Sequence, residues 1–331
     1  MKKALKYLFL FFVARGIAQD AQFTQFYSSP QYLNPAFTGL TAEHRFVANY
    51  RNQWPGVKRA YQTYMAAYDH NFSEVNSGLG ICVMQDKIGF AGLSHTQAGI
   101  NYAYRFTVKK FSEIRAGIGL SYNYKNISYN KLTFNDQLIT GSAVSVETNN
   151  YQPKHYVDIN AGALYNSPKV WLGVAAKHLN QPNVSVIGQQ ERLPLFVGVH
   201  GGYRYVIESK GANSSFLTKY VAVSFNYRHQ LMHDQLDLGF YYCHLPINVG
   251  LWYRGIPFKK YQGKPNNESL AILFGYEVPN KHLRIGYSFD LTISTLGVSN
   301  TFGAHELALV YELAQKSKYK SRKVLVTVPK F

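Results

Sequence analysis

The fold class is decided by the stretch Ile114-Arg115-Ala116-Gly117-Ile118-Gly119-Leu120-Ser121-Tyr122-Asn123-Tyr124. Its even positions carry apolar side chains, and its odd positions carry polar or small ones. Successive side chains of a β-strand point to opposite faces, whereas a helix would mix the two sets. The stretch therefore predicts a strand with one apolar and one polar face.

The same alternation recurs along most of the chain, for example over 98–106 and 283–293. Counting such stretches predicts fourteen strands, at 44–51, 61–72, 77–86, 95–106, 113–125, 156–166, 170–179, 195–207, 218–229, 235–244, 247–254, 269–278, 282–294 and 304–313. Most match the about 9–11 residues of a tilted strand that crosses a membrane. On the strand 282–294, Ile285→Arg should disturb membrane insertion, whereas Ser288→Arg, which points inward, should be milder.

The connections between the predicted strands differ in length on the two sides of the sheet. If the first strand starts in the periplasm, the connections on that side are short, apart from 208–217. Those on the other side are mostly longer, including 255–268, and the longest runs from 126 to 155. Outer-membrane barrels have short periplasmic turns and long outer loops. The chain is therefore predicted to be all-β, a transmembrane antiparallel β-barrel of about 14 strands that spans residues 44–314.

Composition agrees with a wall that meets lipid. Aromatic residues make up 15% of the chain and charged residues 16%, against about 25% charged residues in a typical soluble domain. A soluble, secreted β-sandwich is the alternative, because its strands also alternate. Sandwich strands usually run about 5–6 residues, and tyrosines on the apolar face, such as Tyr102 and Tyr122, suit a membrane interface. Both observations favour the barrel.

The chain begins with a pattern typical of a signal peptide, residues 1–18. Lys2, Lys3 and Lys6 accompany an apolar run, and Gly16-Ile17-Ala18 supplies small residues before a cleavage site after Ala18. The apolar run is shorter than the about 20 residues that a membrane-spanning helix needs. The protein is therefore predicted to be exported, and to reside in the outer membrane of a bacterial cell.

Two further segments fall outside the strand pattern. Residues 19–43 contain Pro30, Asn34-Pro35 and Gly39, which favour turns. This N-terminal segment is predicted to lie in or under the barrel lumen or, alternatively, to form a loose periplasmic arm. Residues 315–331 form a basic tail, which an even number of strands leaves in the periplasm. The tail either docks a partner or is simply solvated.

The net charge of +17 is compatible with nucleic acid, an anionic membrane surface or acidic partners. The export signal makes nucleic acid the least favoured of these. We therefore expect outer-membrane lipid and other proteins as partners, and no nucleic acid.

Motifs that carry chemistry are absent from the sequence. It has no nucleophile elbow, Walker loop or dinucleotide fingerprint. His305-Glu306 lacks the second histidine of a zinc-protease helix, and His229 and His233 flank a predicted turn instead of sharing a helix face. No catalytic, cofactor-binding or metal site is predicted, and the protein is not expected to be an enzyme.

Charged residues on the predicted lumen face are interpreted as an interior network. It consists of the carboxylates Asp158, Asp237, Glu277 and Asp290 with Arg115 and Arg284. Such groups need partners away from water. Cys82 and Cys243 also point inward, but from the third and tenth strands, nearly opposite in the ring. Because a disulfide needs Cα atoms within about 7 Å, none is expected between them.

Several stretches resemble the PorP/SprF family of the type IX secretion and gliding machinery of Bacteroidota. They are Gln19-Asp20-Ala21-Gln22-Phe23-Thr24-Gln25-Phe26, Gln31-Tyr32-Leu33-Asn34-Pro35-Ala36-Phe37-Thr38-Gly39, Tyr50-Arg51-Asn52-Gln53-Trp54-Pro55, Asp86-Lys87-Ile88-Gly89, Leu283-Arg284-Ile285-Gly286-Tyr287-Ser288-Phe289-Asp290 and Gly303-Ala304-His305-Glu306-Leu307. The resemblance covers the whole chain after the signal peptide. Departures are Ala21, where family members often have proline, and the basic tail after Ala314.

The resemblance singles out a set of family-signature residues, which serve either the structure or a partner contact. They are Tyr32, Leu33, Asn34, Pro35, Gly39, Tyr50, Arg51, Asn52, Gln53, Trp54, Pro55, Arg284, Gly286, Tyr287, Asp290, His305 and Glu306.

The resemblance implies a non-catalytic barrel that works with the secretion translocon and its periplasmic motor complex. Family members are associated with delivering or holding large surface adhesins and, in some species, with secretion of other cargo proteins. The outer loops would contact the adhesin or cargo, while the N-terminal segment and the tail would face periplasmic partners. The alternative is a passive, porin-like channel for a small solute. A plugged lumen would favour docking, and an open one the channel.

Overall fold

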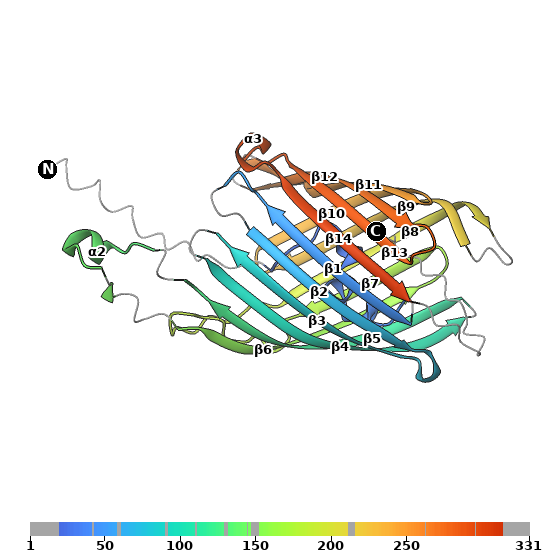
Figure 1. Cartoon of the computed structure of the whole chain (residues 1–331), viewed down its shortest axis with the longest axis horizontal. Coiled ribbons are helices and arrows are strands. Elements are labelled where there is room, and N and C mark those ends of the chain that lie inside the picture. Colours follow the sequence, from blue (N-terminus) through green and yellow to red (C-terminus); the bar gives the residue numbers. More distant parts are fainter. Residues whose placement is uncertain are drawn as a thin grey trace.

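The computed structural model describes residues 20–41, 43–57, 61–89, 92–109, 111–128, 132–143, 145–146, 152–210, 216–261, 263–294 and 296–313. Across these residues, fourteen antiparallel strands close into one barrel (Figure 1), which confirms the predicted fold and strand count. The strands are β1 (His44–Gln53), β2 (Tyr61–Phe72), β3 (Ser77–Ile88), β4 (Leu93–Lys109), β5 (Ser112–Asn126), β6 (Lys154–Asn166), β7 (Val170–Lys177), β8 (Phe196–Lys210), β9 (Phe216–Gln230), β10 (His233–His244), β11 (Ile247–Tyr261), β12 (Lys264–Val278), β13 (Leu283–Thr292) and β14 (Ala304–Leu313).

The barrel closes between its first and last strands. β1 pairs with β14 from His44 opposite Leu313 to Gln53 opposite Ala304. Every other strand pairs with its neighbours in the sequence. Each strand therefore has a partner strand on both sides. Such closure leaves no free sheet edge against hydrocarbon, where each unpaired backbone N–H or C=O group would cost several kcal/mol.

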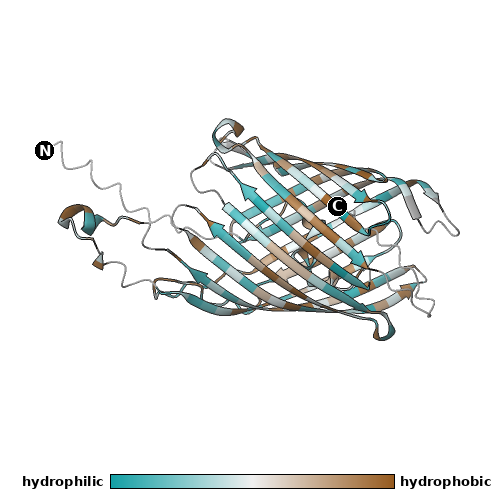
Figure 2. Cartoon of the chain, in the orientation of Figure 1, coloured by the Kyte–Doolittle hydropathy of each residue, from teal (hydrophilic) through white to brown (hydrophobic). Residues whose placement is uncertain are grey.

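The wall is apolar outside and polar inside, as the alternation predicts. In β5, Ile114, Ile118 and Tyr122 are exposed, whereas Arg115 and Ser121 are buried. Figure 2 shows apolar residues along the middle of the strands and hydrophilic residues toward their ends near α2 (Asn135–Thr140). The outer surface thus has the apolar band that a lipid-facing barrel needs.

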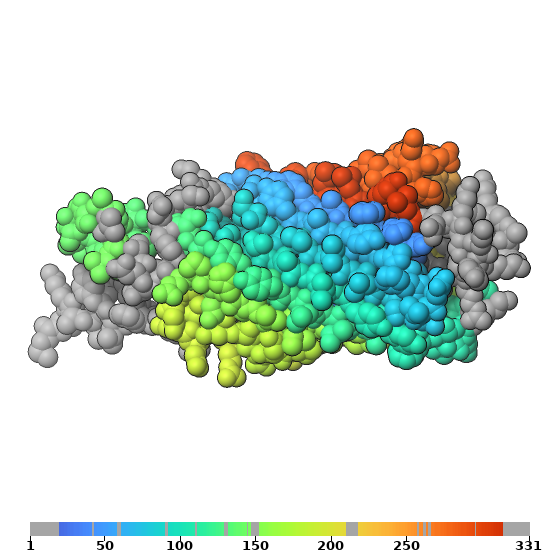
Figure 3. Space-filling view, turned by 60° about the horizontal axis from the view of Figure 1, so that its bottom comes forward, coloured from blue at the N-terminus to red at the C-terminus, as the bar shows by residue number. Residues whose placement is uncertain are grey.

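The connections at one end of the barrel are longer than those at the other. This long-loop end carries the β5–β6 loop with α2, the β7–β8 loop (178–195) and the β13–β14 loop with α3 (Val298–Thr301). In the space-filling view the segment with α2 projects beyond the wall (Figure 3). The opposite, short-turn end carries connections such as 245–246 and the turn with η3 (Ser73–Val75). By the length rule for outer-membrane barrels, the long-loop end faces outward.

Two predicted connections are wrong in extent. The predicted loop 255–268 is mostly strand, because β11 and β12 extend far into it with register shifts after Arg254 and Ile256. The predicted turn 208–217 is shortened in the same way by β8 and β9. Polar residues interrupt the alternation in both places, and the backbone pairing continues regardless of it.

The lumen contains residues 20–41, called the plug below. The plug contains two 3₁₀ helices, η1 (Phe26–Ser28) and η2 (Pro35–Phe37), around the short helix α1 (Pro30–Leu33). Prolines open both α1 and η2, and the Asn34 side chain accepts a hydrogen bond from the Ala36 N–H at 2.9 Å. Proline at a first helical position and asparagine at the cap are the roles that these residues fill best.

The plug brings an apolar core into the barrel interior. Phe26 and Phe37 of the plug cluster with Trp171 and Trp252 of the wall. The indole N–H of Trp171 donates to the Tyr27 hydroxyl at 2.9 Å. A polar lumen was expected from the alternation, but aromatic side chains from both the plug and the wall pack there, so the interior is a packed core on this side.

Residues 1–19 and 314–331 lie outside the described part of the chain. The signal peptide, its cleavage site and the basic tail therefore stay predictions. Among the described residues, no helix combines the length and the apolar character that a membrane crossing requires.

Candidate functional site

The plug is held first by a charge cluster, defined as Arg51, Arg254, Asp290 and Glu306. These side chains come from β1, β11, β13 and β14, which lie within one sector of the barrel. Arg51 lies 2.8 Å from Asp290 and 3.2 Å from Glu306, and Arg254 lies 3.1 Å from Asp290. All four are buried. Two positive charges face two negative ones, which is the condition under which buried charges are tolerated.

The charge cluster also binds the plug backbone near Thr24. Glu306 accepts the N–H groups of Thr24 and Gln25 at 2.6 and 3.0 Å. The Thr24 hydroxyl donates to Asp290 at 2.7 Å, and Arg254 donates to the Phe23 carbonyl at 3.1 Å. The cluster thus satisfies plug groups that would otherwise be buried without partners, and hydrogen bonds to charged groups are stronger than neutral ones.

A second ion pair holds the other end of the plug. Arg45 of β1 and Asp69 of β2 lie 2.5 Å apart, and both are buried. Asp69 accepts hydrogen bonds from the Gln31 side chain at 3.1 Å and from the Gly39 N–H at 3.2 Å. Arg45 donates to the Phe37 carbonyl at 3.3 Å. The pair therefore fixes the chain where it leaves the lumen to enter β1.

Arg115 and Asn34 hold the middle of the plug. The guanidinium of Arg115 donates to the carbonyls of Ala36 and Thr38 at 3.0 and 2.5 Å. The Asn34 amide donates to backbone carbonyls of β6 and β7 at 3.1 and 3.0 Å. Because these contacts join the wall to the plug backbone and to the Asn34 amide, they fix the path of the segment through the lumen.

Glycines in the wall leave the space that the plug occupies. A Cβ atom on Gly117 would lie 2.3 Å from the backbone nitrogen of Ala36, and one on Gly162 would lie 2.1 Å from the Asn34 side-chain oxygen. The same close approach to the plug is found at Gly78, Gly80 and Gly286. A glycine inside a strand is often the sign that another backbone comes close.

Asp20, the first described residue of the plug, lies at the long-loop end. His178, at the start of the β7–β8 loop, places its ring nitrogens 3.0 Å from Asp20 and 3.1 Å from Asp158. Burial works to lower the pKa of His178, but the two carboxylates outweigh it and raise that pKa to about 9. Burial would raise the pKa of Asp20, and the His178 imidazolium holds it below its ordinary range instead.

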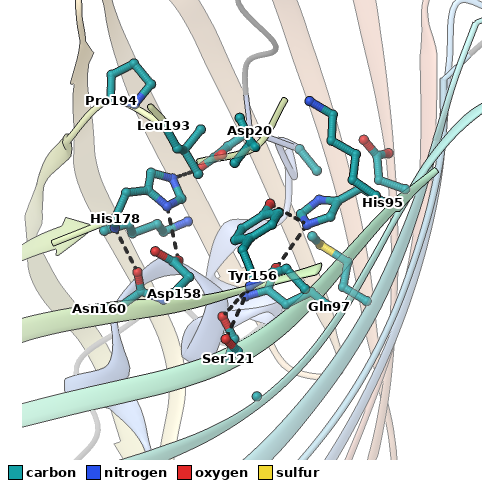
Figure 4. Close-up of a pocket in the computed structure, with 18 of the residues that line it drawn as sticks. Asp20, His95, Gln97, Ser121, Tyr156, Asp158, Asn160, His178, Leu193 and Pro194 are labelled. Atoms are coloured by element: carbon teal, nitrogen blue, oxygen red, sulfur yellow. Dashed lines mark hydrogen bonds and ion pairs between the residues drawn. The ribbon is translucent and has the colours of Figure 1, made fainter. Parts of the chain in front are cut away.

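A cavity of about 920 Å³ lies beside this contact, between the plug and strands β3 to β7 (Figure 4). Gln31 and Tyr32 of the plug contribute to its lining, and Leu193 and Pro194 of the β7–β8 loop lie at its rim. In the close-up, Gln97, Tyr156 and other polar side chains of the wall surround it.

The structure brings many family-signature residues to the interface between plug and wall. Those in the plug are Tyr32, Leu33, Asn34, Pro35 and Gly39, and those in the wall are Arg51, Gly286, Asp290 and Glu306. The Tyr32 hydroxyl donates to the Ala21 carbonyl at 2.8 Å, within the plug. Residues far apart in the sequence thus meet around one short segment.

The other signature residues lie elsewhere on the barrel. Tyr50, Asn52, Tyr287 and His305 stand on the outer face, where the Tyr287 hydroxyl lies 2.8 Å from the His305 ring. Gln53 ends β1 at the long-loop end, and Trp54 and Pro55 follow it. Arg284 forms an ion pair with Glu312 at 3.0 Å near the short-turn end. These residues do not converge on one site.

The interior charge network exists, but its pairing differs from the prediction. Asp158 faces His178, and Asp237 pairs with Arg228 at 2.6 Å. Arg115, expected to pair with those carboxylates, binds plug carbonyls instead and lies 3.8 Å from Glu113. The sequence could not anticipate carbonyl partners that a folded plug supplies.

Several residues of the site were missed at the sequence level, among them Asp69, Arg254 and His178. Alternation alone places Asp69 and Arg254 on the lumen face, and a buried charge there needs a partner. This need for a partner would have marked Asp69 and Arg254 as candidate site residues. His178 lies within the predicted strand 170–179, but β7 ends at Lys177, so the alternation did not indicate that His178 turns into the lumen.

The described residues contain no group of three or more His, Cys, Asp or Glu side chains arranged to hold a metal ion. His229 lies 2.6 Å from Asp234 across the β9–β10 hairpin. Cys82 and Cys243 are not joined to each other by a disulfide in the part of the chain that the structure describes.

The closed wall with its apolar outer band and the packed interior segment define a plugged outer-membrane β-barrel. The family model of the type IX secretion system membrane protein PorP/SprF matches residues 16–311. The chain therefore belongs to the PorP/SprF family, as its motifs suggested, and is a membrane component of type IX secretion.

Solved structures show similarity in fold. The monoaromatic hydrocarbon channel CymD has 10% sequence identity and a TM-score of 0.52, over 88% of this chain and 94% of that one. Omp33, an outer membrane protein of Acinetobacter baumannii, also has 10% identity, with a TM-score of 0.44 over 83% of this chain and all of that one. No curated protein sequence matches this chain.

Proposed function

We propose that this protein is a non-catalytic docking component of the type IX secretion machinery. It holds secreted surface proteins such as adhesins at its outer loops and contacts translocon and motor partners in the periplasm. Membership of the PorP/SprF family supports the assignment to the machinery. The presence of the plug in the lumen is the observation that favours docking over transport.

The plug argues against a steady aqueous path. It is tied to β1, β2, β5, β6, β7, β11, β13 and β14 by the contacts described above. Hydrogen bonds from buried charged groups contribute about 1.5–3 kcal/mol each, so several of them hold the segment firmly. A barrel of this kind serves best as an anchor whose outer surface does the binding.

The β5–β6 loop offers an apolar surface for such a partner. Leu138 and Ile139 of α2 are 72% and 84% exposed, and Val146 is 76% exposed. Asp136 joins the helix to the stretch with Val146, because it accepts hydrogen bonds from the Ser145 hydroxyl and the Val146 N–H at 2.7 and 2.8 Å. Exposed apolar side chains that are held together are typical of protein contact sites.

Affinity purification from solubilised outer membranes tests the proposal. The doubly substituted Leu138→Ser, Ile139→Ser chain should lose the secreted surface protein but keep its periplasmic partners. Val75→Ser, which changes an exposed apolar residue at the short-turn end, is the matched control and should keep the surface protein. Recovery of no secretion partner by the unaltered chain would contradict the docking role.

A passive channel is the second candidate. The cavity at the long-loop end and the likeness in fold to a hydrocarbon channel favour it. Planar-bilayer recordings separate the two functions: a steady open pore of the unaltered barrel would support the channel, and its absence would support docking.

A further inference from the structure

The cavity beside Asp20 has the size and lining of a ligand site that the docking function does not use. Its volume of about 920 Å³ falls within the range of roughly 300–1,000 Å³ that ligand pockets occupy. It lies at the long-loop end, which faces the cell exterior. We propose that this cavity binds the end of a short, uncharged saccharide, a role that does not depend on the proposed docking function.

Neutral amide and hydroxyl groups share the polar lining with charged ones. They include the side chains of Gln31, Gln97, Asn101, Asn123, Asn160 and Ser121. A side-chain amide presents donors and an acceptor in one plane, which matches the paired hydroxyls of a sugar ring. The side-chain amide of Gln97 makes no hydrogen bond to any other residue that the structure describes, so it is available to a ligand.

Charges around the cavity compensate one another. Its acidic residues are Asp20, Asp86, Asp158 and Glu191, and its basic residues, with His178 protonated, are Lys125, Lys177, Arg192 and His178. His178 bridges Asp20 and Asp158, and the Lys177 ammonium lies 3.7 Å from the centre of the Tyr32 ring. A ligand of either sign would upset this balance, so an uncharged one fits best.

Two rings complete the lining. Tyr32 comes from the plug and Tyr156 from β6, with the Tyr156 hydroxyl 3.1 Å from His95. Tyrosine combines a flat apolar ring with a polar tip. The apolar faces of such rings pack on the C–H face of a pyranose, while the amides bind its hydroxyls. A pocket for an amphipathic ligand is expected to combine these two kinds of contact.

The closed wall disfavours a peptide as the occupant. Peptides bind to sheets by adding a strand to an open edge, where main-chain hydrogen bonds supply the affinity. Strands β3 to β5, which line the cavity, are each paired on both sides. β6 pairs with β7 over residues 161–166, and beyond that its edge is covered by Leu179 and Asn180 of the β7–β8 loop, which hydrogen-bond to the backbone of Ile159. A saccharide needs side-chain partners only, and the cavity provides these.

The first experiment uses the unaltered chain in lipid nanodiscs on an array of neutral tri- and tetrasaccharides, with short uncharged peptides as comparators. At least one neutral glycan should be retained. That glycan should also slow the reaction of Cys82, which lines the cavity, with a small methanethiosulfonate reagent. Retention of peptides alone, or of nothing, would overturn the proposal.

A matched pair of variants then locates the site. Gln97→Leu removes an amide from the cavity and should weaken glycan binding roughly three- to tenfold, the value of a lost hydrogen bond. Gln62→Leu makes the same change at the start of β2, outside the lining, and should leave binding unchanged. Equal loss in both variants would place the glycan elsewhere.

Discussion

The two ends of the Asp20–Gln25 stretch of the plug are held by different chemistry. At Thr24 and Gln25 the holding groups are the four members of the charge cluster, all buried and paired in balance. At Asp20 the holding group is His178, which lies beside the cavity and shares its ring with Asp158. The end at Thr24 and Gln25 depends on charges that persist across the physiological pH range, and the end at Asp20 depends on His178, which titrates.

This difference indicates which part of the plug is permanent and which is adjustable. Arginine stays charged at any pH that a cell meets, so Arg51 and Arg254 keep the charge that Asp290 and Glu306 balance. Histidine is the side chain that responds to moderate pH changes. We therefore expect the end near the cavity to loosen first, while the rest of the plug stays in place.

The largest effect should follow from breaking the charge cluster. Asp290→Ala leaves Arg51 and Arg254 buried with one carboxylate between them, and loss of a partner in a buried pair costs about 3–5 kcal/mol. Urea unfolding in lipid vesicles should show a lower midpoint, and bilayer recordings should show openings. Asp136→Ala, in the exposed β5–β6 loop, is the control and should show neither. An unchanged midpoint in Asp290→Ala would mean that the cluster does not hold the plug.

Crowding the plug from the wall should have a smaller effect. Gly117→Ala would place its Cβ 2.3 Å from the Ala36 nitrogen, so the plug must shift, at a cost of about 1–3 kcal/mol for overpacking. Thermal unfolding should show a lower Tm for this variant. Gly198→Ala, whose nearest neighbour would be a Phe196 ring atom at 3.2 Å, should be close to the unaltered chain. Equal Tm values for the two variants would argue that the plug does not press on β5.

Removing the charge at the cavity end should be milder still. Asp20→Asn weakens one hydrogen bond to His178, while Asp158 keeps the ring in place, so we expect a loss of roughly 1 kcal/mol. Deuterium uptake in the peptide that contains Asp20 to Phe23 should rise, with no change in peptides of the charge cluster. A rise in both regions would contradict the separation of the two ends.

The pH dependence of that exchange should be the finest test. The pKa of His178 is raised from 6.5 to about 9, so its contribution is complete below 6.5 and is lost as the pH rises through 9. The pKa of Asp20 is lowered from 3.8, so its contribution is present above that value and is lost in acid. Deuterium uptake near Asp20, corrected for intrinsic rates, should therefore rise at alkaline pH. His178→Asn should abolish that rise, and a rise that persists would assign it to another group.

The inward side of β13 shows what alternation does not predict. Alternation places Ser288 inside the barrel, and for this reason alone Ser288→Arg was expected to disturb membrane insertion less than Ile285→Arg. In the structure Ser288 is fully buried, and the Gln25 amide lies 3.5 Å from its hydroxyl. A larger side chain there would meet the plug, so the packing weighs against a mild effect of Ser288→Arg, and the comparison with Ile285→Arg stays a prediction. Ile285, exposed on the outer face, stands as expected.

The sequence indicated only parts of the candidate site. The stretches with Asn34-Pro35, Arg51 and Asp290 resemble a family, but the sequence did not distinguish the roles of these residues. Only folding shows that Asn34 belongs to the plug and that Arg51 and Asp290 bind it near Thr24. The cavity had no sign in the sequence, because its lining is gathered from β3 to β7, the plug and the β7–β8 loop.

The sequence by itself determined the wall: the period-two alternation follows from strand geometry and fixes which side chains meet lipid, residue by residue. The tertiary structure decided how the interior is filled. An alternating pattern says that a residue points inward, but the segment it meets there depends on contacts between positions more than 200 apart, such as Thr24 with Glu306. Local periodicity carries no information about such contacts, so the plug and its cavity emerge only once the barrel has closed around them.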